Sequence, residues 1–161
     1  FGNNRNMVET TQVTIICGPP GSGKTTYVRE QSSWGDLVVD LDAIFAAMTG
    51  LPWYDKPANL VSFIHDLREC IYGMIERNRV APHVWIITSG ARESERELLR
   101  DRFNAEVVVL EVSPLECMNR IMKDDRRRER AAQWEKIVDG WWRTYERTRL
   151  AKELHDHSSA H

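Results

Sequence analysis

The chain has 161 residues and a mass of 18.7 kDa, a size that suits one domain and leaves little room for two. Hydrophobic residues make up 42% and charged residues 29%, which excludes a wholly disordered chain. The formal net charge of -2 excludes a protein that is basic over its whole surface. No run of about 18 apolar residues is present, which excludes a membrane-spanning helix. The three cysteines are widely spaced and indicate reduced thiols in a cytoplasmic protein.

Four apolar runs alternate with helical patterns, which predicts an α/β fold with a parallel sheet of four or five strands flanked by helices. The runs are rich in β-branched residues and cover residues 13–17, 37–39, 84–88 and 107–112. One helix is expected from Asn59 to about Asn78, and two more open on capping boxes at Ser94 and Ser113.

Apolar residues recur at helical spacing near the end of the chain and predict a C-terminal helix over about residues 132–152. Two interpretations of this stripe are open. The spacing favours a helix packed on the sheet, and the alternative is a platform on which bases stack. The stripe consists of Trp134, Ile137, Val138, Trp141, Trp142 and Tyr145.

A glycine-rich motif follows the first predicted strand. Residues 18–25 read G-P-P-G-S-G-K-T and match the phosphate-loop pattern G-x-x-x-x-G-K-[ST] completely. Gly21 and Gly23 permit turns in which successive N–H groups point at phosphate oxygens, Lys24 would reach the β- and γ-phosphates, and Thr25 would bind Mg²⁺. The alternative is a turn without a ligand. The motif therefore predicts a P-loop NTPase fold that binds ATP through Gly18, Pro19, Pro20, Gly21, Ser22, Gly23, Lys24, Thr25 and Thr26.

The absence of other motifs narrows the class of P-loop protein. The sequence has no N-K-x-D motif of the Ras-type GTPases, no hydrophobic run ending in Asp-Glu, and no second helical domain of the AAA+ kind. A single domain of this length instead suits the small phosphoryl-transfer kinases.

Two carboxylates, Asp40 and Asp42, follow the second predicted strand, at the edge where open α/β sheets bind ligands. Phosphoryl transfer to a hydroxyl needs a carboxylate near the acceptor. The alternative is that the pair forms a turn and a helix N-cap, a role that suits Asp42 before Ala43.

Basic residues concentrate between residues 120 and 152, which contain eleven Lys and Arg against six Asp and Glu. The run Lys123–Arg130 has no apolar periodicity. It is interpreted as part of a lid over about residues 120–131 whose arginines clamp ATP phosphates, and the alternative is a solvated helix face.

With these motifs in this order, the chain resembles a group of P-loop kinases that includes the kinase domain of bacteriophage polynucleotide kinase. More distantly it is similar to zeta toxins and nucleoside monophosphate kinases. The resemblance runs from Val13 to about Tyr145 and rests on the phosphate loop, the Asp after strand two, the segment 85–89 followed by Glu95 and Arg96, and the Arg-bearing segment after residue 110. It implies an adenylate-kinase-like strand order, a single kinase domain over residues 1–161, and a cytoplasmic location (the host cytoplasm if a phage encodes the protein).

The resemblance also implies roles for individual residues. Asp42 would be the general base, with Asp40 as the second candidate or as a water-mediated partner of Mg²⁺. Charge on the β- and γ-phosphates would be compensated by Arg120 and one of three lid residues, Arg126, Arg127 or Arg128.

Some acceptor-side positions depart from the group's pattern. Phe45 stands where the polynucleotide kinase carries an Arg that grips the acceptor's phosphate, and no acid ends the third strand. Arg92 occupies roughly the place where nucleoside monophosphate kinases hold the acceptor phosphate, or it is a surface Arg. In the loop 51–57, Trp53 and Tyr54 either stack on an acceptor base, with Lys56 at its phosphate, or plug the loop with hydrophobic contacts.

The leading hypothesis is an ATP- and Mg²⁺-dependent kinase whose acceptor is a nucleotide or a single-stranded nucleic-acid 5′ end. We expect neither membrane association nor an obligate protein partner. Two alternatives remain: a kinase of a small non-nucleotide metabolite, and a non-catalytic ATP-dependent switch or packaging-type ATPase.

Overall fold

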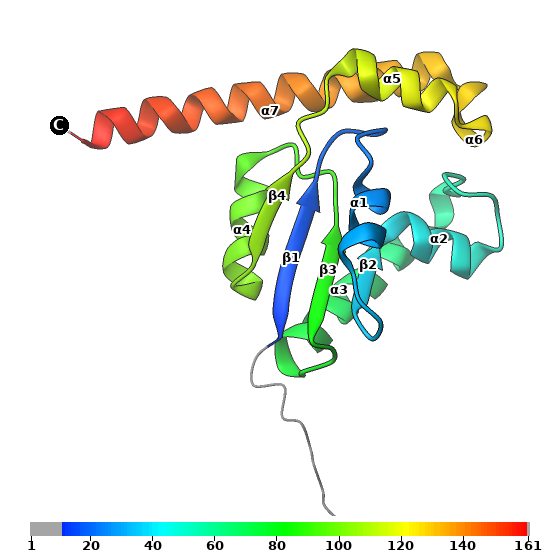
Figure 1. Ribbon diagram of the computed structural model, residues 1–161, viewed down its shortest axis with the longest axis horizontal. Helices are drawn as coiled ribbons and strands as arrows, with labels where there is room; N and C mark the ends of the chain where they lie inside the picture. Colours follow the sequence, from blue (N-terminus) through cyan, green and yellow to red (C-terminus); the bar gives the residue numbers. More distant parts are fainter. Residues whose placement is uncertain (1–10, 161) are drawn as a thin grey trace, which may run out of the picture.

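A computed structural model describes residues 11–160. Helices cover both faces of one parallel sheet and also lie across the carboxyl ends of its strands (Figure 1). The sheet has four strands in the order β2-β3-β1-β4, which confirms the predicted fold class. All three strand pairings are parallel. The strands are β1 (Gln12–Cys17), β2 (Leu37–Asp40), β3 (His83–Ile87) and β4 (Glu106–Val109).

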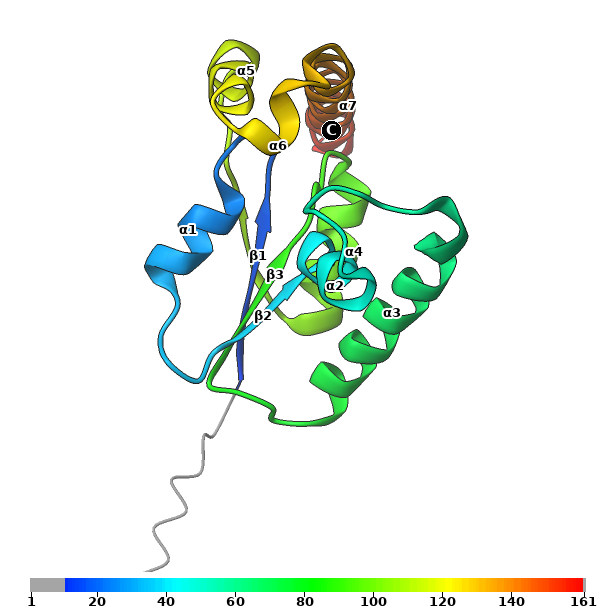
Figure 2. The ribbon, with the colours of Figure 1, turned by 90° about the vertical axis from the view of Figure 1, so that its right-hand side faces the viewer.

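Three layers are visible when the sheet is seen edge-on (Figure 2). Helix α1 (Lys24–Gln31) covers one face, and the other is covered by α2 (Leu41–Thr49), α3 (Val61–Arg77) and α4 (Glu93–Phe103), with a short turn of 3₁₀ helix, η1 (Ala58–Leu60), before α3. Across the carboxyl ends of the strands lie α5 (Pro114–Met122), α6 (Asp125–Arg128) and α7 (Ala131–Ser159).

Alternating residues of β1 supply the core on both faces, because both faces of a parallel sheet are buried. Ile15 points into a cluster with Tyr72 and Ile75 of α3. Its neighbour Ile16 points to the opposite face and packs with Val28 of α1. Both isoleucines are fully buried, so β1 is the central support of the phosphate loop that follows it.

The observed helix ends correct parts of the sequence prediction. The capping box at Ser113 is confirmed on its Ser side, since the Ser113 hydroxyl accepts a hydrogen bond from the N–H of Glu116 at 3.2 Å. The predicted cap at Ser94 is wrong: α4 begins at Glu93, so Ser94 lies in its first turn. Asn59 is also not the cap of the long helix, because it lies inside η1.

Helix α7 lies across the strand ends rather than on a face of the sheet, which corrects the expected packing. The indole N–H of Trp141 donates to the carbonyl of Ser89 at 2.7 Å, and that of Trp142 donates to Val112 at 3.1 Å. Trp141 is buried and stacks on Tyr145 with a centroid separation of 4.8 Å. These rings are therefore occupied within the protein and form no open stacking platform.

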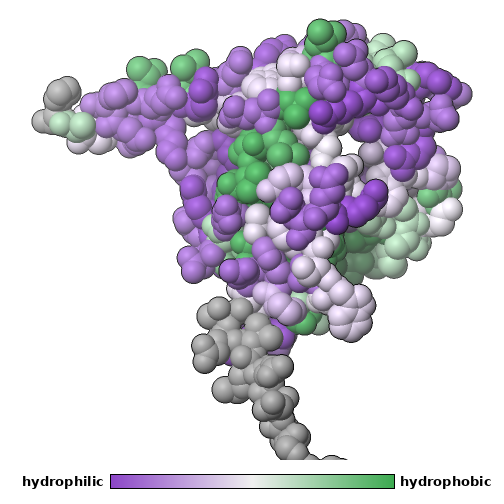
Figure 3. All heavy atoms as spheres, in the orientation of Figure 1, coloured by the Kyte–Doolittle hydropathy of each residue, from purple (hydrophilic) through white to green (hydrophobic). Residues whose placement is uncertain are grey.

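The last turns of α7 extend past the end expected near residue 152 and reach Ser159. They project away from the sheet, and Figure 3 shows this arm as mostly hydrophilic. Lys152 ties the base of the arm to α4 through ion pairs with Glu93 at 2.9 Å and Glu97 at 3.1 Å. Within residues 11–160, no helix has both the length and the apolar character needed to cross a membrane.

A buried arginine joins α4 to the loop after β3 and to α7. Arg96 is 4% exposed and donates to the carbonyl oxygens of Gly90 at 2.5 Å and Ala91 at 3.0 Å. It also pairs with Glu93, and its guanidinium lies 4.9 Å from the centroid of the Tyr145 ring. A buried cation that donates to two carbonyls and pairs with an acid fixes the elements around it, because its removal leaves the Gly90 carbonyl without this donor.

We expect Arg96→Met to lower the free energy of unfolding by about 2–4 kcal/mol, since the buried carbonyl of Gly90 loses its donor and the partly buried carbonyl of Ala91 loses its shorter hydrogen bond. Arg100→Met, on the same helix with a partly exposed 3.9 Å ion pair to Glu97, should change it by less than about 0.5 kcal/mol. Urea unfolding of both variants measures the difference. Equal losses in the two variants would contradict the anchoring role of Arg96.

Candidate active site

The phosphate loop leaves β1 between the ends of β3 and β4. The N–H of Gly18 donates to Ser89 at 3.1 Å, and the N–H of Leu110 donates to Cys17 at 2.8 Å, so the loop is hydrogen-bonded to both neighbouring strands. Gly21 and Gly23 have φ values of 77° and 87°, in the left-handed region that residues with a Cβ rarely adopt. The two glycines thus adopt the backbone turns that the motif predicted.

Lys24 starts α1 and turns its ammonium back toward the loop. Its Nζ donates to the carbonyl oxygens of Gly18 at 2.8 Å and Pro19 at 3.0 Å. Burial lowers the pKa of Lys24 to about 8, an effect partly offset by the negative charges of Asp42 and Asp40. The ammonium and the two carboxylates therefore share one electrostatic environment at the carboxyl edge of the sheet.

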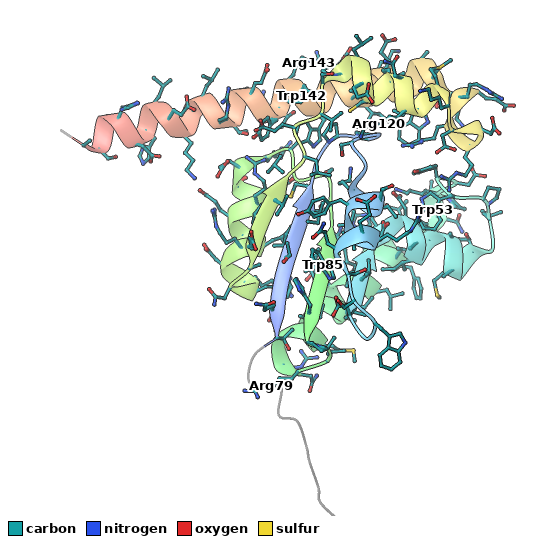
Figure 4. The ribbon with its side chains drawn as sticks, in the orientation of Figure 1. Trp53, Arg79, Trp85, Arg120, Trp142 and Arg143 are labelled. Carbon is teal, nitrogen blue, oxygen red and sulfur yellow. The ribbon has the colours of Figure 1, made fainter. Side chains whose placement is uncertain are left out.

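Helix α5 covers the outer side of the phosphate loop. A Cβ at Gly21 would lie 2.7 Å from the carbonyl oxygen of Cys117, so helix and loop are in backbone contact. Arg120 reaches down from α5 (Figure 4) and donates to Ser22 at 3.0 Å and Gly21 at 3.4 Å. The structure thus brings Arg120 onto the loop where the sequence placed it.

Asp40 is the N-cap of α2, which corrects the sequence interpretation that assigned the capping role to Asp42. Its Oδ1 accepts the N–H of Asp42 at 3.0 Å. Burial and the neighbouring Asp42 charge raise the pKa of Asp40, opposed by hydrogen bonds from the backbone and by Lys24. Part of the Asp40 carboxylate is therefore committed to helix capping.

Asp42 occupies the first turn of α2 and carries an ion pair that the sequence did not predict. Its Oδ1 lies 2.5 Å from Nζ of Lys56. The same oxygen is inaccessible to solvent and has no hydrogen-bond partner in suitable geometry. The predicted base thus meets a lysine from the loop between α2 and η1.

The lid arginines are held by acids of their own segment. Arg126 makes two hydrogen bonds to Asp124, at 3.0 and 3.1 Å, and Arg127 makes a third at 2.9 Å. Arg128 pairs at 2.9 Å with Asp125, and both side chains are mostly exposed. The structure therefore does not place these three guanidinium groups on the phosphate loop, in contrast to Arg120.

Of the remaining candidates on the acceptor side, one is buried in the core and two are at least partly exposed. Phe45 is 2% exposed and belongs to the core, which removes it from the surface that a substrate can touch. Trp53 is half-buried on the loop after α2 (Figure 4), with its ring 6.4 Å from that of Tyr54. Arg92 is exposed at the N-terminus of α4.

The residues present fit a nucleotide phosphate and, in part, a magnesium ion. The Ser22 hydroxyl is buried without a hydrogen-bond partner, and an ammonium has three donors, of which Lys24 uses two on carbonyls. The exposed Thr25 is the second residue of α1 and supplies a hydroxyl oxygen beside this loop, and Asp40 adds a carboxylate oxygen. Both are of the hard donor type that Mg²⁺ prefers. No group of three His, Cys, Asp or Glu side chains suited to a metal ion occurs within residues 11–160, so the protein would supply only part of the ligand set.

Sequence reasoning missed three contacts. These are the ion pair of Lys56 with Asp42, the binding of two arginines by Asp124, and the contact of the lid with Tyr54. The ring of Tyr54 lies 4.8 Å from the Arg127 guanidinium. Asp124 followed by Asp125 and three basic residues is an N-cap signal for a short helix that could have been recognised. The other two contacts carry no local pattern.

A phosphate loop at the carboxyl edge of this parallel sheet, with a lysine and an arginine fixed on it, defines a P-loop nucleotide-binding protein with a kinase-like fold. The sequence comparison makes the assignment more specific. Residues 13–148 match the AAA domain family, and the chain belongs to it. Within residues 11–160 the helices after β4 lie across this one sheet and build no second helical domain.

Two solved structures with TM-scores above 0.5 share the fold at low sequence identity. A chain of the Pnkp1/Rnl/Hen1 RNA repair complex superposes with a TM-score of 0.64 at 14% identity, over 88% of this chain and 46% of that chain. A second structure of the Pnkp1/Rnl/Hen1 complex gives 0.53 at 16% identity, over 68% and 38%. Shikimate kinase from Acinetobacter baumannii in complex with shikimate gives 0.48 at 18%, over 95% and 97%. The chain thus spans less than half the length of the first two, and no curated protein matches it in sequence.

We expect ATP binding to take up a proton above pH 8, because phosphate oxygens favour the charged form of Lys24, whose pKa is about 8 in the free protein. The contribution of Lys24 to ATP affinity should be constant below pH 8, and above pH 8 the affinity should fall by up to about tenfold per pH unit. Calorimetry in buffers of different ionisation enthalpy measures the uptake. Lys24→Arg, which keeps its charge, should abolish the uptake; an unchanged uptake in this variant would assign the proton to another group.

Proposed function

We propose that this protein is an ATP- and Mg²⁺-dependent phosphotransferase that phosphorylates a nucleic-acid 5′ end or a nucleotide. The observation that carries the proposal is the joint electrostatic environment of Lys24, Asp40 and Asp42. A cation on the phosphate loop and a carboxylate pair at the same sheet edge are the two parts that transfer to a hydroxyl requires.

Each residue has a separate task in this proposal. ATP with Mg²⁺ would supply the phosphoryl group and neutralise part of its charge. Lys24 and Arg120 would hold the phosphates against the loop, and Thr25 and Asp40 would support the metal. Asp42 would accept the proton of the acceptor hydroxyl while that oxygen bonds to the γ-phosphorus and the bond from phosphorus to ADP breaks.

Two observations support a nucleic-acid or nucleotide acceptor. The loop after α2 carries the aromatic residues Trp53 and Tyr54 shortly before a cation, Lys56, and bases stack on rings such as that of the half-buried Trp53. In addition, a structure of this fold belongs to an RNA repair complex. The lid arginines would join the phosphates only after leaving Asp124, whose three hydrogen bonds hold them in this conformation.

We expect Asp42→Asn to lower turnover by roughly 10²–10⁴-fold while ATP affinity stays within about threefold, because it removes the proton acceptor alone. Single-turnover transfer of labelled γ-phosphate and direct ATP binding measure the two effects. Unchanged turnover would eliminate Asp42 as the base.

Asp40→Asn is the matched variant, because Asn caps a helix as well as Asp does. It should leave thermal stability nearly unchanged and raise the Mg²⁺ concentration needed for half-maximal turnover by about 10–100-fold. A magnesium titration of turnover gives this value. A turnover loss at saturating Mg²⁺ as large as that of Asp42→Asn would exchange the two roles.

The acceptor is tested by offering 5′-hydroxyl oligonucleotides, nucleoside monophosphates and small hydroxylated metabolites in parallel. We expect labelled phosphate on the first or second class. Transfer to metabolites alone would support a metabolite kinase, and ATP binding without any transfer would support a switch.

A further inference from the structure

We propose that Lys56 keeps Asp42 from acting as a base until an anionic group of the acceptor draws its ammonium away. This inference rests on the proposed function, because it concerns the acceptor side of the same site. It assigns to Lys56 a positioning role and defines the acceptor as a hydroxyl compound with an anionic group close to the hydroxyl.

The first argument is the ion pair itself. Nζ of Lys56 lies 2.5 Å from Oδ1 of Asp42, and that oxygen is closed to solvent. While the ammonium of Lys56 stays in this position, an acceptor hydroxyl cannot approach Oδ1 of Asp42. Lys56 must therefore move away before this oxygen can serve a hydroxyl.

The second argument is that the pair is weak enough to separate. The side chains of Lys56 and Asp42 are 39% and 31% exposed, and ion pairs with this access to water contribute little to stability. The ammonium also lies 5.6 Å from the centroid of the Phe45 ring, a contact that it can keep while it turns to another anion. The charged oxygens of an acceptor phosphate would compete with the Asp42 carboxylate for the same ammonium.

The third argument is that the loop around Lys56 is fixed, so that only its side chain needs to move. Asp55 pairs with Arg130 at 2.7 Å. The ring of Tyr54 meets that of Trp134 at 5.2 Å and the Arg127 guanidinium at 4.8 Å. Tyr54 has a φ of 75°, a strained conformation that persists only where surrounding contacts impose it.

These contacts limit where the acceptor's anion can lie. The four-carbon stem of Lys56 turns on a fixed backbone, and its ammonium begins beside the Asp42 carboxylate. An anion that takes the ammonium must therefore lie within a few ångströms of the hydroxyl that faces Asp42. The phosphate nearest the 5′-hydroxyl of a nucleic acid, or the phosphate of a nucleotide, meets this condition, whereas a neutral hydroxyl compound does not.

The test compares two 5′-hydroxyl oligonucleotides that differ at the first linkage, an ordinary phosphodiester in one and an uncharged methylphosphonate in the other. Wild type should prefer the charged acceptor by about 10–100-fold in kcat/KM, with part of the loss in kcat because Asp42 stays paired. Lys56→Met should reduce the preference to about threefold or less and use the neutral acceptor better than wild type does. Lys56→Arg should restore most of the preference, and Lys136→Met, an exposed lysine on α7, should behave as wild type.

A role of Lys56 in loop stability alone would lower turnover of both acceptors equally in Lys56→Met and leave their ratio unchanged, which would overturn the inference. Equal use of both acceptors by wild type would overturn it as well, and the proposed function would stand. If wild type phosphorylates neither, a nucleic-acid 5′ end is excluded as the acceptor in the proposed function, and fluorescence anisotropy with the same two oligonucleotides tests whether Lys56 recognises the charged linkage. A binding preference for the charged oligonucleotide that Lys56→Met removes supports it, and equal binding in both proteins refutes it.

Discussion

The carbonyl oxygen of Ser89 joins three parts of the protein on which the candidate site depends, namely the end of β3, the phosphate loop and helix α7. It lies just beyond the end of β3 and accepts the N–H of Gly18 at 3.1 Å and the indole N–H of Trp141 at 2.7 Å. The first bond sets where the phosphate loop leaves the sheet, and the second sets where α7 crosses above it. A carbonyl has two lone pairs, and both are used here. The position of the loop and that of the last helix are consequently not independent.

The elements with local patterns were predictable from sequence. Strand runs, the phosphate loop and the Ser113 cap each depend on residues adjacent in the chain, and the parallel sheet follows from the alternation of strands and helices. The order of the strands was implied only by the resemblance to P-loop kinases. Asp40 and Asp42 show the limit of such reasoning. The two candidate N-caps of α2 are two residues apart, and helix propensity does not locate a helix start to within two residues.

The unpredicted contacts join segments that are distant in sequence and depend on how a loop without periodicity folds back. Lys56 reaches Asp42, and Tyr54 reaches Trp134 of α7. Phe45 is the reverse case: its position suggested a substrate contact, yet α2 turns that side chain into the core. Charge patterning likewise revealed the arginine-rich lid but not that Asp124 would bind two of its arginines. The cationic excess of this segment is therefore partly balanced inside the segment itself.

One end of that segment is attached to the phosphate loop and the other to the loop after β3. Arg120 attaches the end of α5 to Ser22, and Trp141 attaches α7 to the carbonyl of Ser89, which also accepts the N–H of Gly18. Residues 123–130 lie between these two attachments. A fully extended residue covers about 3.5 Å, so the midpoint of this segment can lie at most about 14 Å from either of its ends. Its arginines can therefore move only within a bounded distance of the phosphate loop and of the loop after β3.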